Sequence, residues 1–229
     1  MQAGTAVGNL AGVIGVRPEE AAVVEQLKAG SEDAFAWLIS RYQQPLYSLI
    51  YRILPNPGDA ADITQEVFVK VFRGIAHFHG EASLRTWIYR IALHEALNQR
   101  RWWARHQRQQ VTIDADRDDP HASPAENLVD THESPFDAAA HAEIAERVEA
   151  ALREVPEPFR TVVVLRDIEG FGYEEIAEIL DANLGTVKSR LMRGRAHLKN
   201  LLTPYMEAAN RKPSHRSSVA RACSAEEAV

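Results

Sequence analysis

The sequence predicts an all-α protein made of two small helical domains joined by a flexible acidic linker. Apolar residues recur at helical spacing from about residue 21 to 108, and again from about 138 to 203. Between these stretches, the chain loses the periodicity and is rich in Asp, Pro, Ser and Ala, a composition that buries too little apolar surface to order itself. The predicted divisions are a flexible N-terminus at 1–20, a first domain at 21–110, the linker at 111–137, a second domain at 138–203 and a disordered tail at 204–229.

The first main helix is expected to begin after Ser31, whose hydroxyl is placed to cap its N-terminus. The run Pro55–Gly58 is expected to end it, because two prolines and a glycine do not propagate a helix. One face of this helix is predicted to carry Phe35, Leu38, Ile39 and Tyr42, followed by Leu46, Leu49, Ile50 and Ile53.

A second helix is expected to be capped by Asp59, and a third is predicted from about Ser83 to Arg105 after a break at 74–80. The predicted core face of the second helix consists of Ile63, Val67, Val71 and Phe72. A rotated face carries Asp62, Gln65, Glu66 and Val69, which by itself is typical of a solvated acidic surface.

An aromatic and polar loop, residues 78–83, leads into the third helix, which is rich in arginine. Such a loop suits an unstacked base, because aromatic faces stack on bases and polar groups read their edges. The residues leave core packing and base contact both open for Phe78, and they favour core packing for Trp87.

The second domain is predicted to end in a helix-turn-helix. Two helices are expected first, at 138–155 and 159–168. They are followed by a helix at 173–180, a turn at 181–185 and a last helix at 186–202, which Pro204 is expected to end. The helix at 138–155 is expected to present one apolar face made of Ile144, Val148, Leu152 and Val155. The last helix carries five Lys and Arg residues and no acid, which suits phosphate contact and guanine reading. A solvated basic face on an ordinary helical hairpin is the alternative.

The charge of the whole chain, −6, hides a local contrast. Residues 21–110 carry 11 Lys and Arg against 8 Asp and Glu, whereas residues 111–140 carry 1 against 8. Most of the negative charge therefore belongs to the linker. The net charge of the chain does not argue against DNA binding, because only the surface that contacts phosphate has to be basic.

Composition argues against several classes of protein. No apolar run reaches the ~18 residues of a membrane helix, and no signal peptide is expected, so we expect a cytoplasmic protein without membrane insertion. Cys223 is the only cysteine, which excludes an intramolecular disulfide. The scattered histidines and the lack of a nucleophile set or glycine-rich phosphate loop predict no metal, no cofactor and no enzyme activity.

Three segments, DITQEVFVKVF, FHGEASLRTWIYRIA and GTVKSRLMRGRAHL, resemble motifs of the bacterial extracytoplasmic-function sigma factors, the group IV branch of the sigma-70 family. The motifs occur in the family's order and spacing, and the resemblance covers about residues 21–203 apart from most of the linker. It implies a first domain equivalent to sigma region 2 and a second equivalent to region 4. It also implies a subunit that binds core RNA polymerase, recognises the −35 and −10 promoter elements and helps melt the −10 region.

The resemblance further implies which residues meet which partner. The helix that binds the clamp helices of the polymerase β′ subunit matches Asp62, Gln65, Glu66, Phe68 and Val69. The base-capturing loop and the helix that contacts the −10 element match Phe78, His79, Ser83, Arg85, Trp87, Arg90, His94, Asn98 and Arg101. The −35 contacts match Thr186, Lys188, Ser189, Arg190, Arg193 and Arg195. Region 4 is implied to pack on the β flap, and an anti-sigma factor is implied as a further partner.

A stand-alone helix-turn-helix transcriptional regulator is the alternative function. Its first domain would bind an effector or dimerise, and it would bind duplex DNA tightly without polymerase. No pattern typical of a ligand pocket occurs in residues 21–108, which argues against this alternative. The basic last helix argues against an anti-sigma or scaffold protein.

Overall fold

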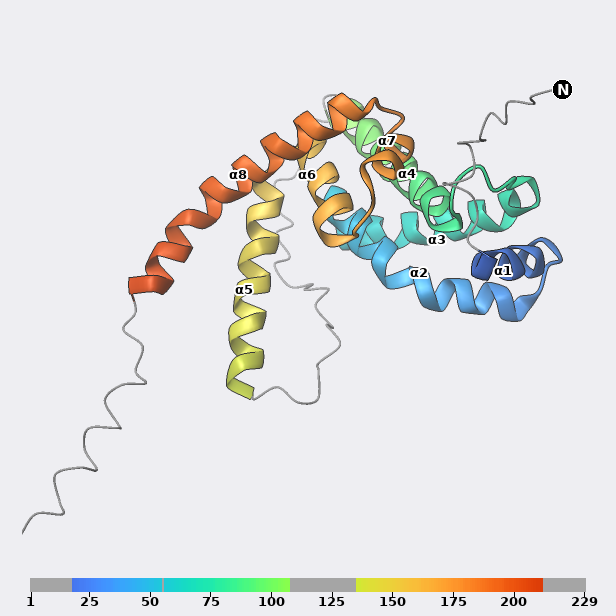
Figure 1. Ribbon diagram of the computed structural model, residues 1–229, viewed down its shortest axis with the longest axis horizontal. Coiled ribbons are helices and arrows are strands. Elements are labelled where there is room, and N and C mark those ends of the chain that lie inside the picture. The colour runs from blue at the N-terminus through green and yellow to red at the C-terminus, as the bar shows by residue number, and fades with distance from the viewer. Residues whose placement is uncertain (1–17, 55, 108–134, 212–229) are drawn as a thin grey trace, which may run out of the picture.

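In the computed structural model, the described residues are 18–54, 56–107 and 135–211, and all regular structure in them is helical, as the sequence predicts (Figure 1). The elements are α1 (Pro18–Lys28), α2 (Glu32–Ile53), α3 (Pro57–Gly74), a 3₁₀ turn η2 (Ile75–His77), α4 (Leu84–Gln107), α5 (Pro135–Glu154), α6 (Glu157–Val163), a π-helical turn η3 (Val164–Ile168), α7 (Tyr173–Leu180) and α8 (Leu184–Arg211). Most of the predicted linker and the end of the tail with Cys223 lie outside the described residues, as does most of the N-terminal segment.

The first unit is built on α2, α3 and α4, which pack on one another, with α1 against α2. The Ser31 hydroxyl accepts a hydrogen bond from the backbone N–H of Ala34, which confirms the predicted cap of α2. Along α2, the side chains that turn inward and are buried are Ala34, Leu38, Tyr42, Leu46, Leu49, Ile50 and Ile53.

The cap predicted at Asp59 was wrong. Helix α3 begins at Pro57, and the side chain of Asn56 accepts the backbone N–H of Gly58 at 2.8 Å. Proline suits the first helical position, because its missing N–H would have no partner there. The helix therefore starts before the predicted cap, and Asp59 lies in its first turn.

Two predicted core residues are exposed. Phe72 is 60 % exposed and Ile39 is 41 % exposed, although helical spacing placed both on core faces. The inward stripe of each helix is narrower than the predicted one and contains Leu38 and Val71. The exposed Phe72 ring packs on the partly buried Phe35 ring of α2, with centroids 4.9 Å apart.

The second unit contains α5 to α8, and α5 and α8 project away from the other helices (Figure 1). Helix α5 begins at Pro135, within the predicted linker, again with proline at the first helical position. Its C-terminal part reaches the core, since Leu152 and the following Val155, just beyond the helix, are buried whereas Ile144 is 59 % exposed. The expectation that Ile144 joins the core face was therefore wrong.

Pro204 does not end the last helix, contrary to the sequence prediction. Helix α8 continues through it to Arg211. Proline removes one backbone hydrogen bond in a helix interior, and contacts elsewhere have to offset that loss. Beyond Pro204, the Arg147 guanidinium of α5 lies over the Tyr205 ring at 5.1 Å, a contact of about 0.5–1 kcal/mol that offsets part of this loss.

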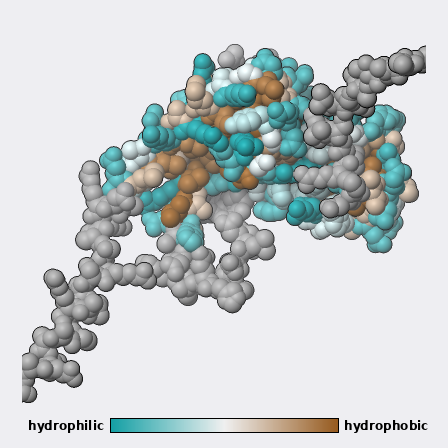
Figure 2. All heavy atoms as spheres, viewed as in Figure 1, coloured by the Kyte–Doolittle hydropathy of each residue, from teal (hydrophilic) through white to brown (hydrophobic). Residues whose placement is uncertain are grey.

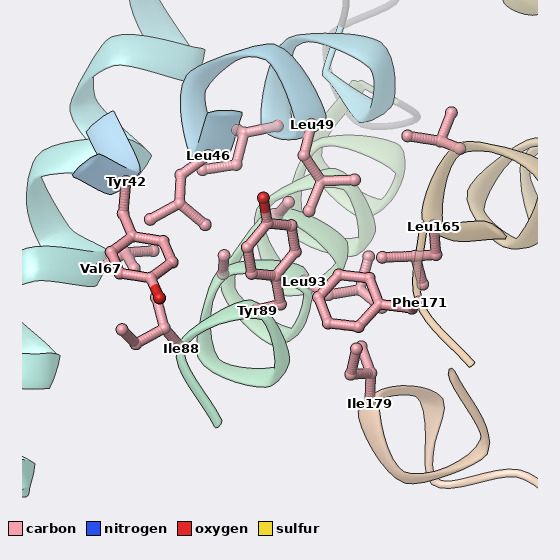
Figure 3. Close-up of a cluster of buried hydrophobic side chains, with 14 of the residues drawn as sticks. Tyr42, Leu46, Leu49, Val67, Ile88, Tyr89, Leu93, Leu165, Phe171 and Ile179 are labelled. Carbon is pink, nitrogen blue, oxygen red and sulfur yellow. The ribbon is translucent and has the colours of Figure 1, made fainter. Parts of the chain in front are cut away.

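The two units share one continuous cluster of buried apolar side chains (Figure 3). Tyr89 of α4 lies between Leu46 and Leu49 of α2 on one side and Phe171 on the other. The rings of Tyr89 and Phe171 meet edge to face with centroids 4.8 Å apart. Both side chains are almost fully buried, so α4 contributes to the hydrophobic core of each unit. Figure 2 shows a further apolar area over the second unit, beside its teal, hydrophilic surface.

Position 194 requires glycine because α8 lies very close to α6 there. A Cβ atom there would lie 2.5 Å from Val163 Cγ2 and 3.0 Å from the carbonyl oxygen of Phe159. Because one of these atoms is backbone, the contact cannot be relieved by a side-chain rotation alone.

We expect Gly194→Ala to lower the free energy of unfolding by about 2 kcal/mol. The overpacking cost of up to ~3 kcal/mol exceeds the ~1 kcal/mol that alanine gains in helix propensity. Urea denaturation measures the change. Met192→Ala, an exposed change on the same helix, should alter stability by less than about 0.5 kcal/mol. A Gly194→Ala protein as stable as the parent would contradict this account of the α6–α8 contact.

Candidate nucleic-acid interface

Helices α7 and α8 form a helix-turn-helix. Asp181 ends α7 in the left-handed backbone region, with φ of 48°. The Asn183 side chain then accepts the backbone N–H of Thr186 at 2.8 Å, which stabilises the first turn of α8. Val187 and Leu191 are buried, and they anchor the inner face of this helix.

The outer face of α8 is basic and accessible. Lys188, Ser189 and Arg193 are exposed, and Arg190 is half-buried. The Lys188 ammonium lies 6.0 Å from the centre of the Tyr173 ring, so an aromatic face supports it. These accessible residues belong to the predicted −35 set, and their contact with DNA stays a prediction.

Arg195 differs from the rest of that set because it already has an acidic partner. Its Nε and Nη2 atoms donate to Asp167 of η3 at 3.0 and 2.5 Å. The side chain is 52 % exposed, so a phosphate that approached it would compete with Asp167. Its role in −35 contact stays a prediction.

The predicted base-capturing loop is closed in this conformation. Phe78 is 4 % exposed, and its ring packs on Trp87 with centroids 5.2 Å apart. Ser83 caps α4 by accepting the backbone N–H of Thr86 at 3.0 Å. His79 is exposed. Base capture by this loop stays a prediction, and Phe78 meets a base only if the loop rearranges.

The first turns of α4 are covered by the second unit. Arg85 donates from Nη2 to the carbonyl oxygen of Glu169 at 2.5 Å, and its guanidinium lies 4.1 Å from the centre of the Phe171 ring. The Tyr89 hydroxyl donates to the Glu169 carboxylate at 2.6 Å. Burial, with help from that carboxylate, raises the pKa of Tyr89 far above its usual value, so the hydroxyl remains a proton donor. We call Arg85, Tyr89, Glu169 and Phe171 the seam.

The backbone before α7 creates the seam. The π-helical turn η3 is followed by Gly170, whose φ of +75° is readily adopted only by glycine. This reversal places Glu169 and Phe171 against α4. The Glu175 carboxylate then accepts both the backbone N–H of Gly172, at 2.7 Å, and the Thr86 hydroxyl of α4, at 3.3 Å.

Ion pairs at the edges strengthen the contact between the two units. Arg52 of α2 makes a bidentate pair with Glu149 of α5, with donor–acceptor distances of 2.5 to 3.1 Å. Arg100 of α4 donates to Glu157 of α6 at 2.6 Å. These partners lie far apart in the sequence, and no sequence pattern indicated any of them.

The later turns of α4 remain exposed. His94, Arg90 and Arg101 are open to solvent, and Asn98 is half-buried. Hydrogen bonds join His94 to Asn98 at 3.1 Å and Arg101 to Asn98 at 2.7 Å. This stripe presents donors in a fixed arrangement on a basic helix.

The docking face predicted on α3 is largely accessible. Asp62, Gln65 and Glu66 are exposed, and Val69 is 39 % exposed. Phe68, by contrast, packs partly against the core. The exposed Phe72 falls beside Val69 on the same side of α3, and sequence reasoning missed it because its spacing indicated the core.

Comparison with known proteins follows the division into two units. Residues 38–108 match sigma-70 region 2, and residues 145–198 match sigma-70 region 4. The chain is 32 % identical to the RNA polymerase sigma-H factor of Pseudomonas aeruginosa over 187 residues, which cover 82 % of this chain and 95 % of that protein. It is 36 % identical to the ECF RNA polymerase sigma-E factor of Haemophilus influenzae over 193 residues, covering 81 % and 96 %.

The chain belongs to the extracytoplasmic-function branch of the sigma-70 family. As a sigma factor it directs promoter-specific transcription, and the first and second units are its regions 2 and 4.

A solved structure supports the fold. The chain is similar to the sigma factor RpoE in complex with the anti-sigma factor NepR from Bartonella quintana, with a TM-score of 0.58 and 21 % identity. The similarity covers 74 % of this chain and 96 % of that one. In the part of the sigma factor that the structure describes, no helix is long and apolar enough to cross a membrane.

We expect Glu169→Ala to loosen the seam. The change removes the acceptor of the buried Tyr89 hydroxyl and one partner of Arg85, which should cost about 2 kcal/mol. Urea denaturation measures stability, and small-angle scattering should report a larger radius of gyration as the two regions separate. Glu174→Ala, an exposed change in the neighbouring turn of α7, is the control and should alter neither quantity. Unchanged scattering and stability in Glu169→Ala would show that the seam does not hold the regions together.

Proposed function

We propose that this sigma factor divides promoter recognition among three surfaces on three helices. The face of α3 binds the β′ clamp helices of core RNA polymerase, α4 and the loop before it meet the −10 element, and α8 reads the −35 element. The observation that carries the proposal is the basic outer face of α8, where Lys188, Ser189 and Arg193 are exposed above a buried apolar anchor. Arginine and lysine in that position suit both phosphate contact and guanine reading.

The seam implies a change of conformation on binding. Arg85 is expected to contact the −10 element, yet it is engaged by Glu169 and Phe171 of region 4. Region 4 therefore moves off α4 before Arg85 reaches DNA. Binding to core polymerase, with region 4 on the β flap, supplies free energy for that separation. An anti-sigma factor is a further proposed partner, and the solved complex of the similar sigma factor with NepR supports it.

The function is tested by run-off transcription on fragmented genomic DNA with purified core polymerase, with and without this chain. New discrete transcripts that require the chain are expected, and their start sites define the −10 and −35 elements. Tight, sequence-specific DNA binding by the chain alone, without new transcripts, would instead favour a stand-alone regulator.

We expect the double change Arg190→Ala with Arg193→Ala to abolish selection of −35-dependent promoters while binding to core polymerase persists. Loss of an arginine that reads a base costs about 1–3 kcal/mol and relaxes specificity, whereas loss of a phosphate contact weakens binding to all sequences alike. Run-off transcription and a core-binding titration measure the two properties separately. Met192→Ala, between the two arginines on the exposed side, is the control. Equal loss of core binding in the double variant would contradict the assignment of these arginines to DNA.

We expect Asp62→Ala with Gln65→Ala to weaken binding to core polymerase by about tenfold, because both exposed side chains lie on the proposed docking face of α3. Fluorescence titration of labelled core polymerase measures the dissociation constant. The matched control is Glu32→Ala with Asp33→Ala, which also removes exposed polar side chains from region 2, at the start of α2. Unchanged affinity of the first variant would place the docking face elsewhere.

A further inference from the structure

Three arginines from the two regions gather where α5 ends and α6 begins. Arg100 lies on α4 of region 2, Arg153 in the last turn of α5 and Arg160 on α6. The Arg160 Nη1 atom donates to the backbone carbonyl oxygen of Arg153 at 3.0 Å, and the Arg100 guanidinium donates to Glu157 of α6 at 2.6 Å. We call Arg100, Arg153 and Arg160 the arginine cluster. None of the three belongs to the proposed polymerase-binding, −10 or −35 surfaces.

Two of these arginines lack an acidic partner. Within the described residues, Arg153 donates to a tyrosine hydroxyl and Arg160 to a backbone carbonyl, and neither makes an ion pair with a carboxylate. The Glu157 carboxylate is already engaged by the third arginine of the cluster. Glu149, one turn before Arg153 on α5, is held in its bidentate pair with Arg52. The cluster therefore carries positive charge that these two carboxylates do not balance.

The Arg160 guanidinium is partly buried and incompletely hydrogen-bonded. Its Nε atom is shielded from solvent and has no hydrogen-bond partner among the described residues. Burial lowers the pKa of Arg160; the Glu157 carboxylate opposes this shift, and the positive charges of Arg100 and Arg153 add to it. A cation that is partly removed from water is costly unless an opposite charge pairs with it. An added anion would supply that charge.

The cluster is accessible from solvent and partly held in place. Arg153 is exposed, the Arg100 side chain is 36 % exposed, and Arg160 is half-buried. The Arg153 guanidinium lies over the Tyr51 ring of α2 at 5.4 Å and donates to its hydroxyl at 3.3 Å. Each guanidinium offers a planar fork of donors that matches two phosphate oxygens. Three such forks suit a multiply charged phosphate with several oxygens better than a carboxylate with two.

We propose that the arginine cluster binds a small phosphate anion, and that the bound anion ties region 4 to region 2. Arg100 belongs to region 2, whereas Arg153 and Arg160 belong to region 4, so one anion bridges the regions only in the closed conformation. Free phosphates and the phosphate groups of a nucleotide share this chemistry. Because region 4 is proposed to leave α4 on binding to core polymerase, the anion opposes that step. This consequence, unlike the anion site itself, rests on the proposed function.

The test is isothermal titration calorimetry of the full chain with sodium pyrophosphate, in a phosphate-free buffer and with sodium chloride at matched ionic strength as the blank. Saturable binding of pyrophosphate is expected. Arg153→Gln and Arg160→Gln should each raise the dissociation constant by about tenfold, because each removes a charge-assisted contact. A second titration with ATP separates the two sources: tighter binding than pyrophosphate assigns the site to a nucleotide, and weaker binding assigns it to a free phosphate.

Arg147→Gln is the matched control. Arg147 is an exposed arginine on the same helix as Arg153, it pairs with Glu143, and it lies outside the cluster. Its loss should change the dissociation constant less than about twofold. Equal losses in Arg147→Gln and Arg153→Gln would indicate general attraction to positive charge and would overturn the site. Since Arg153 is exposed, its variant tests the site even if Arg160→Gln fails to fold. Absence of saturable pyrophosphate binding by the parent would also overturn it.

The bridge between the regions is tested by the double change Arg100→Gln with Glu157→Gln. This variant removes an ion pair and keeps the net charge, so weaker binding reports the lost contact from region 2. A dissociation constant raised about fivefold or more is expected. Unchanged affinity would confine the anion to region 4 and overturn the bridge. These titrations contain neither polymerase nor DNA, so a failure of the proposed promoter-recognition surfaces would leave an Arg153-dependent anion complex in place.

Discussion

The Glu169 carboxylate and the backbone carbonyl beside it organise the contact between the two regions. The carboxylate accepts the Tyr89 hydroxyl at 2.6 Å, and the carbonyl accepts the Arg85 guanidinium at 2.5 Å. A buried carboxylate is costly unless it is hydrogen-bonded, so each partner constrains the others. Phe171 completes the contact by packing on both the Tyr89 ring and the Arg85 guanidinium. Region 4 is thereby docked on the helix that region 2 is proposed to use for the −10 element.

Helix α4 contacts different parts of the protein along its length. Its first turns serve the seam, its buried side packs on α2 and α3, and its later turns present His94, Asn98 and Arg101 to solvent. The same helix therefore couples the closed conformation to DNA contact. A partner that separates the regions frees Arg85, and one that holds them together keeps it engaged. The exposed stripe is accessible in either case.

Charge is distributed in the same local way. The acidic linker dominates the charge of the chain, whereas the outer face of α8 and the end of α4 are basic. Several acidic residues within the described units are partners of arginines: Glu149 and Glu157 bind arginines across the two regions, and Asp167 binds Arg195 within region 4. Such pairs fix the positions of the charged side chains and disfavour other arrangements of them, even where each pair contributes little to stability.

The sequence by itself determined the helical class, the division into two units and the family, because helical periodicity and the three motifs are local in the chain. It also predicted a basic last helix, and the structure leaves Lys188, Ser189 and Arg193 of that helix exposed. Only the tertiary structure decided which apolar residues stay exposed, as Phe72 and Trp102 do, because burial depends on what packs against a face. The seam was equally beyond prediction, since its partners lie about 80 residues apart. The extension of α8 past Pro204 was not predicted either, since local propensity ends a helix at proline and the contact between Tyr205 and Arg147 of α5 joins distant parts of the chain.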